Sequence, residues 1–227
     1  MDSDMDALLE KIHSRGYWRV VISPTSYEAN RIPKLATCRE IIEASTVSLR
    51  GWNYPHVETT TLTNRRRWIE SSVDWAHGHI EYWRFYQSGQ FVHHFAMRED
   101  YEESSRASRG LDFINTLYTF TEILEFAARL ASRNVLHPGA DITVTLHGTE
   151  GRRIISWDPR RRMFDFYIAA DPEISFAKEV GADSLLGEAG DIALDATEYV
   201  FERFNSSDVP RTLLAEEQSK LLERRLS

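Results

Sequence analysis

The chain has 227 residues, of which 42% are hydrophobic and 27% are charged, a balance typical of a folded globular protein rather than a disordered chain. Its formal net charge of −8 disfavours non-specific binding to nucleic acid, although a local basic patch can still bind phosphates. The single cysteine, Cys38, excludes an intramolecular disulfide, and the sequence shows neither a secretion leader nor an apolar run of about 20 residues that could cross a membrane. We therefore expect a soluble, cytoplasmic protein with no membrane segment.

In the first hundred residues, hydrophobic periodicity predicts two helices and four strands. The expected helices span residues 2–15 and 35–44, and the expected strands span residues 17–23, 46–52, 80–86 and 91–97. The last two strands form a hairpin, and with Ser88-Gly89 as a two-residue loop Arg84 lies opposite His93. On the other side of this hairpin, Trp83 then lies opposite His94. Because both faces carry aromatic residues, we expect the hairpin at the centre of the sheet, covered on both sides.

The rest of the chain is expected to hold a core helix, a meander of three strands and two further helices. The expected helices span residues 110–134, 191–204 and 212–226, and the expected strands span residues 142–146, 153–157 and 163–169. The first of these helices is the longest, and its apolar residues cover more than one stripe, as expected in a core. Because the strands gather in antiparallel groups, the order favours the α+β class: a mixed, mainly antiparallel sheet packed against a long central helix, with N- and C-terminal helices.

The sequence predicts a single α+β domain over residues 1–209 and a C-terminal helical extension over residues 210–227. A narrow apolar stripe runs along the extension, formed by Leu213, Leu214, Leu221, Leu222 and Leu226. A helix this short is marginal in isolation, so it must dock on its own domain or on another chain. We favour contact with a protein partner or a second copy of the chain, since the longer helices already cover the sheet.

No catalytic or cofactor-binding motif stands out. Glycine-rich phosphate loops, the nucleophile elbow and paired-cysteine motifs are absent from the sequence, so we expect no cofactor and leave open whether the protein is an enzyme. His77 and His79 share one face of a strand, but no spacing fixes a third ligand, and we expect no metal site. Cys38 lies on the apolar side of its helix, which favours a buried structural thiol over a nucleophile.

Two groups of residues could still carry a function. Arg160, Arg161 and Arg162 lie at an expected hairpin turn, where their guanidinium groups could contact the phosphates of a nucleic acid. The second group is a candidate pocket assembled from residues far apart in the sequence. It consists of Trp52, His56, Arg84 and His93.

Aromatic and polar residues are unusually dense in two stretches, residues 50–56 (Arg-Gly-Trp-Asn-Tyr-Pro-His) and residues 82–91. These stretches resemble ones found in uncharacterised bacterial proteins, some of which carry a Schlafen-type AlbA-like DNA-binding domain. The resemblance implies a bacterial source and work alongside nucleic-acid or antiviral defence machinery, and it names no catalytic residue. Together these observations favour a non-enzymatic binding or scaffold protein that acts through a protein partner. A nucleic-acid-associated module and an enzyme with a dispersed active site are the alternatives.

Overall fold

The computed structural model describes residues 2–75, 78–101, 109–157, 167–206 and 209–224. The helices are α1 (Asp2–His13), α2 (Leu35–Ser45), α3 (Phe113–Ser132), α4 (Ala182–Arg203), α5 (Arg211–Leu222) and the short 3-10 helix η1 (Arg98–Asp100). The strands are β1 (Tyr17–Pro24), β2 (Thr63–Asn64), β3 (Trp68–Trp75), β4 (His79–Tyr86), β5 (Phe91–Ala96), β6 (Gly110–Asp112), β7 (Gly139–His147), β8 (Arg153–Ile155) and β9 (Glu173–Gly181). Across the described ranges, no helix is long and apolar enough to span a membrane.

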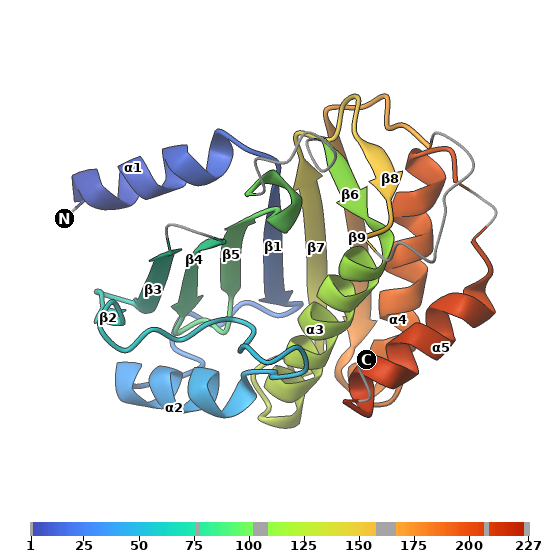
Figure 1. Cartoon of the computed structure of the whole chain (residues 1–227). Coiled ribbons are helices and arrows are strands. Elements are labelled where there is room, and N and C mark those ends of the chain that lie inside the picture. Colours follow the sequence, from blue (N-terminus) through green and yellow to red (C-terminus); the bar gives the residue numbers. More distant parts are fainter. Residues whose placement is uncertain (1, 76–77, 102–108, 158–166, 207–208, 225–227) are drawn as a thin grey trace.

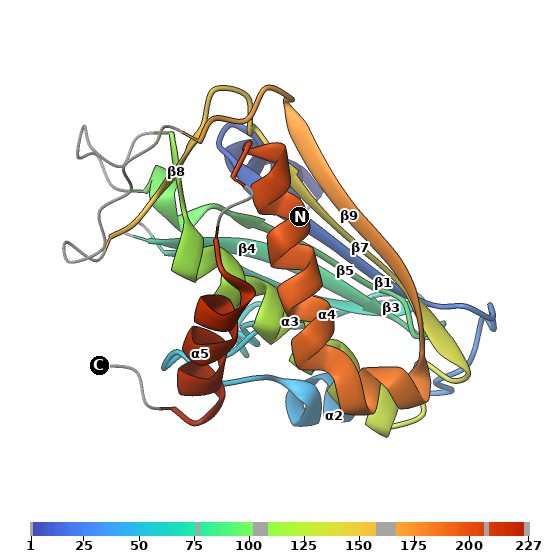
Figure 2. The same ribbon diagram turned by 90° about the vertical axis from the view of Figure 1, so that its right-hand side faces the viewer.

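Seven of the strands form one antiparallel sheet in the order β2-β3-β4-β5-β1-β7-β9, and β6 and β8 form a separate parallel pair (Figure 1). Helices α2 to α5 lie on one face of the large sheet, where they enclose the main core (Figure 2). Helix α1 covers part of the opposite face, where Ile12 packs with Ile80 and Tyr82. The α+β class, the mainly antiparallel sheet and the terminal helices are therefore confirmed.

Helix α3 is the centre of the main core. The side chain of Asp112 caps its N-terminus by accepting a 2.8 Å hydrogen bond from the backbone N of Asn115. Thr116 and Thr121 are fully buried, and their hydroxyls donate to carbonyl oxygens one turn earlier, so neither is left unsatisfied. The predicted core helix is confirmed, although residues 110–112 form β6 instead of helix. It is not the longest helix, because α4 has 22 residues and α3 has 20.

The β4–β5 hairpin lies in the middle of the sheet, as predicted, but the predicted register is wrong by one residue. Trp83 lies opposite His93, and Arg84 lies opposite Val92. Because successive side chains of a strand point to opposite faces, this shift places Trp83 and His93 together on the α3 side of the sheet. Arg84 points to the other side, away from His93.

The loop of this hairpin explains the difference in register. Tyr86 N donates to Gln90 O at 2.9 Å, so the loop holds three residues rather than the two that were predicted. Gly89, the last loop residue, has a φ of +88°. Three-residue hairpin loops need a left-handed residue at this position, and glycine adopts that conformation without a steric penalty.

Two further strand predictions are wrong. Residues 46–52 form no strand, and a single bridge joins Val47 to Tyr54. The meander does not form, because β8 pairs in parallel with β6 and the neighbours of β7 are β1 and β9. The expected strand over residues 163–169 lies mostly outside the described residues. β9 was not among the predicted strands, although its alternating buried residues are typical of a strand with one covered face.

Helix α5 packs on its own domain. Leu214 and Leu221 are fully buried in the main core, and Gln218 Nε2 donates to Thr121 Oγ1 of α3 and to the backbone oxygen of Gly190 in α4. Leu214 and Leu221 of the predicted apolar stripe therefore pack inside the chain, while Leu222 is 40% exposed and Leu226 lies outside the described residues. Contact with another chain through this helix stays a prediction.

Candidate functional site

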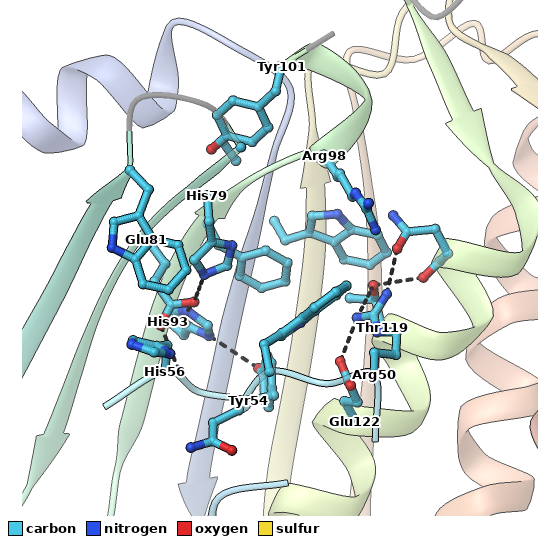
Figure 3. A pocket seen from close by; sticks show the side chains of 18 residues that line it. Arg50, Tyr54, His56, His79, Glu81, His93, Arg98, Tyr101, Thr119 and Glu122 are labelled. Atoms are coloured by element: carbon cyan, nitrogen blue, oxygen red, sulfur yellow. Dashed lines mark hydrogen bonds and ion pairs between the residues drawn. The ribbon is translucent and has the colours of Figure 1, made fainter. Parts of the chain in front are cut away.

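A cavity of about 520 Å³ lies between strands β4 and β5 and the N-terminal half of α3. Figure 3 shows Glu81 and His93 on its sheet side and Thr119 and Glu122 of α3 on the other. Asn115, Thr119 and Glu122 face the cavity together because residues four and three positions apart share one face of a helix. Residues between 50 and 56, Arg98 of η1 and Tyr101 form its rim.

Aromatic side chains form much of the cavity wall. Tyr54 and Phe95 pack edge to face with their ring centroids 6.1 Å apart. Trp52 and Trp75, which are 37% and 49% exposed, line the cavity where it meets solvent. The ring of His56 packs against that of Trp75 at 4.9 Å. The wall therefore offers flat apolar surfaces beside polar groups, which is typical of sites for organic ligands.

Glu81 is a buried carboxylate that contacts the imidazoles of His79 and His93 and the backbone of His56. Its Oε2 lies 2.5 Å from Nε2 of His79 and 3.6 Å from Nε2 of His93, and its Oε1 accepts a 2.8 Å hydrogen bond from the backbone N of His56. Burial acts to raise the pKa of Glu81, but His93 and His79 outweigh that effect and lower the pKa to about 2. Glu81 is therefore ionised at neutral pH and fixes the orientation of the partly exposed His79 ring.

His93 is fully buried behind this pair. Its Nδ1 lies 3.3 Å from the hydroxyl of Tyr54, and its Nε2, at 3.6 Å from Glu81 Oε2, is within ion-pair distance but makes no hydrogen bond among the described residues. Burial, followed by the charges of Glu81 and Glu122, raises the pKa of Tyr54 well above its ordinary value, so the phenol stays protonated. A polar chain from Tyr54 through His93 and Glu81 thus reaches the partly exposed His79.

On the helix side of the cavity, Arg50 and Glu122 form an ion pair. Arg50 Nη2 lies 2.5 Å from Glu122 Oε2, and Arg50 Nη1 donates to Asn115 Oδ1 at 2.5 Å. The side chain of Glu122 is fully buried and that of Arg50 is 12% exposed. Removing either partner would leave the other charge buried without compensation, so the pair fixes segment 50–56 against α3.

Arg98 of η1 lies at the rim between two indole rings. Its Cζ is 5.4 Å from the ring centroid of Trp52 and 5.3 Å from that of Trp157, which are cation–π distances. The same Trp52 ring also contacts Arg50, at 5.1 Å. Within the described part of the chain, no carboxylate pairs with the guanidinium of Arg98.

Four buried polar atoms of the cavity lining have no hydrogen-bond partner among the described residues. They are Nε of Arg50, Nε2 of His93, the hydroxyl oxygen of Tyr101 and Oε1 of Glu122. Such a group costs about 1–3 kcal/mol when it is left unpaired, so native proteins hold few of them. The set includes donors and acceptors, and a polar ligand in the cavity could pair with both.

The structure brings together three of the four residues of the predicted pocket. Trp52, His56 and His93 line the cavity, whereas Arg84 does not. Arg84 lies on the opposite face of the sheet, where its Nε is 3.2 Å from Glu70 and its guanidinium packs over Trp68. The one-residue error in the hairpin register is the reason that Arg84 was placed beside His93.

Several lining residues were not among the predicted site residues. Glu81, Arg50, Arg98 and Glu122 carry most of the charge of the cavity. One signal was available: Glu81 alternates with Trp83 and Phe85 on the buried face of β4, where a carboxylate needs a partner. Glu122 had a comparable signal, since the other residues of the stretch 117–124 in α3 are all apolar or hydroxyl-bearing.

Other predicted sites have different outcomes. Cys38 is fully buried, and burial raises the pKa of its thiol to about 11, as expected for a structural cysteine. Arg160, Arg161 and Arg162 lie outside the described residues, as does His77. No group of three or more His, Cys, Asp and Glu side chains in the described ranges is arranged to hold a metal ion.

Comparison of the chain with models of protein families, with curated proteins and with solved structures gave no match. The geometry of the cavity therefore carries the functional argument.

Proposed function

We propose that the protein binds a small organic molecule in the cavity between β4, β5 and α3. The observation that carries the proposal is that four buried polar atoms, which make no hydrogen bond among the described residues, converge on one cavity of about 520 Å³. Ligand sites are usually concave, mostly apolar and equipped with a few converging polar groups. Trp52 and Trp75 supply flat surfaces for the apolar part of the ligand, and the buried polar atoms supply specificity.

A second candidate function, an acid–base enzyme, is favoured by the pair formed by His79 and Glu81. A carboxylate that orients an imidazole is a common arrangement for a general base. No serine or cysteine lines the described cavity, so proton transfer is the chemistry that its side chains offer best. His79→Gln should abolish turnover of a substrate while leaving the binding of an inert probe intact.

The proposals made from the sequence stand beside this one. They are contact with a protein partner through the C-terminal helix, nucleic-acid contact by Arg160, Arg161 and Arg162, and a role in bacterial defence.

Fluorescence titration with N-phenyl-1-naphthylamine, a neutral aromatic dye, tests the proposal. We expect saturable binding to one site in the wild-type protein. Trp52→Ala and Trp75→Ala should each weaken it by roughly three- to tenfold, because aromatic contacts contribute about 0.5–1.5 kcal/mol beyond buried area.

The matched control is Tyr27→Ala, which removes an aromatic side chain that is 82% exposed and outside the cavity lining. Its affinity for the dye should equal that of the wild type. Absence of saturable binding, or an equal loss in the Tyr27 variant, contradicts the proposal.

A further inference from the structure

We infer that the cavity selects an organic anion and that Arg98 is the residue that binds its negative group. This inference rests on the proposed function and names the chemical class of its ligand. The class is a planar or aromatic body carrying a carboxylate or a phosphate.

The first support is that the acidic neighbours of Arg98 are engaged elsewhere. Glu99 is fully buried, and its Oε1 accepts hydrogen bonds from the backbone N of Asp112 and from Asn115 Nδ2, both at 3.0 Å. Asp100 forms an ion pair with Arg152 and accepts from the backbone N of Gly16 at 2.7 Å. Neither carboxylate in η1 therefore neutralises Arg98.

The second support is the charge balance of the cavity lining. The two carboxylates that line the cavity, Glu81 and Glu122, already have cationic or imidazole partners: His79 and His93 for Glu81, and Arg50 for Glu122. The guanidinium of Arg98 is thus the charged group of the described lining that forms no ion pair. With the histidines neutral, Arg50 and Arg98 balance Glu81 and Glu122, so the attraction for an anion is local to Arg98.

The third support is the way in which Arg98 is held. The contacts with the rings of Trp52 and Trp157 are cation–π contacts, and no N–H group of Arg98 donates a hydrogen bond within the described residues. A guanidinium presents these N–H groups in a planar fork that matches carboxylate or phosphate oxygens. Because Trp52 also lines the cavity, a flat body stacked there would place its anionic group next to Arg98.

Two dyes with the same aromatic body separate this inference from the proposed function. 1-Anilinonaphthalene-8-sulfonate carries a negative group, and N-phenyl-1-naphthylamine lacks it. We expect the wild-type protein to bind the anionic dye up to about fivefold more tightly, which corresponds to about 1 kcal/mol for an ion pair at the exposed Arg98. Arg98→Gln should remove this advantage and leave the affinity for the neutral dye unchanged, which also shows that the cavity is intact.

The matched control is Arg19→Gln, which removes an exposed arginine of β1 that does not line the cavity. It should keep the preference for the anionic dye. Competition with 1-naphthoate, 1-naphthyl phosphate and 1-naphthylmethanol then identifies the charged group. We expect one of the two anions to displace the bound dye at lower concentration than the alcohol.

The outcomes are distinct. Binding of neither dye overturns both the proposed function and this inference. Equal binding of the two dyes, or an anionic preference that survives Arg98→Gln, overturns the inference and leaves the proposed function standing. Displacement by the alcohol as effective as by both anions also overturns it.

Discussion

Trp83 and His93 are cross-strand partners on β4 and β5, and the indole N–H of Trp83 donates a 2.8 Å hydrogen bond to the backbone oxygen of His56. This hydrogen bond links the fully buried Trp83, at the centre of the sheet, to the segment that forms the cavity rim. We expect Trp83→Ala to lower the free energy of unfolding by about 3–5 kcal/mol, the usual cost of truncating a large buried aromatic. Urea denaturation measures this change, with Tyr27→Ala as the exposed control. An unchanged midpoint contradicts the central place of Trp83.

The lowered pKa of Glu81 predicts that the protein loses stability in acid. Its pKa is about 2 in the folded protein, against about 4.3 for an unfolded glutamate. A carboxyl group with a lowered pKa stabilises the fold above the unfolded pKa, and this contribution is lost as the pH falls towards the folded value. Glu81→Gln should therefore be less stable than the wild type at pH 7, and the difference should shrink between about pH 5 and pH 2. Denaturation curves at several pH values test this, and a difference that does not vary with pH contradicts it.

The raised pKa of Glu99 predicts the opposite dependence of stability on pH. Burial raises its pKa, and Asp112 adds to the effect, so the folded state binds a proton more readily than the unfolded state does. Stability from this group rises as the pH falls from the raised pKa towards about 4.3. Glu99→Gln keeps an acceptor for the N–H groups of Asp112 and Asn115 but cannot ionise. It should be more stable than the wild type at neutral pH, and the advantage should vanish near pH 4. A variant that is less stable at pH 7 would refute this.

Truncation after Val209 should strongly destabilise the protein. The change removes Leu214 and Leu221 from the main core and leaves Thr121 of α3 without its contact from Gln218. Each buried leucine lost costs about 2–5 kcal/mol, and domains of this kind have only about 5–15 kcal/mol in total. Thermal unfolding together with mass in solution tests the expectation. An unchanged melting temperature with loss of an oligomer would show instead that α5 serves assembly.

The sequence predicted element types better than element partners. Periodicity was sufficient for α1, β1 and α2, because each has one covered face, and for the core helix α3, whose apolar residues cover more than one stripe. It could not show that β8 pairs with β6, since both are three residues long and their pairing depends on how α3 is placed.

The candidate site shows the same limit. The sequence predicted that Trp52, His56 and His93 converge, because aromatic and polar residues are unusually dense in the segments around them. All three line the cavity. Arg84 was misplaced because the length of the hairpin loop decides which face a side chain occupies. Glu122 comes from α3, 72 residues beyond Arg50, and their pairing follows only from the docked fold.

The central claim, that the cavity binds a small aromatic molecule, is tested most directly by the indole N–H signals of the six tryptophans in an NMR titration with N-phenyl-1-naphthylamine. Trp18, Trp52 and Trp75 line the cavity, whereas Trp68, Trp83 and Trp157 are not part of its lining. Single Trp→Phe variants assign the signals. We predict saturable shifts at Trp52 and Trp75 with one common dissociation constant, and no shift at Trp68 on the opposite face of the sheet. Shifts confined to Trp68, or equal and non-saturating shifts at all six, would contradict the account.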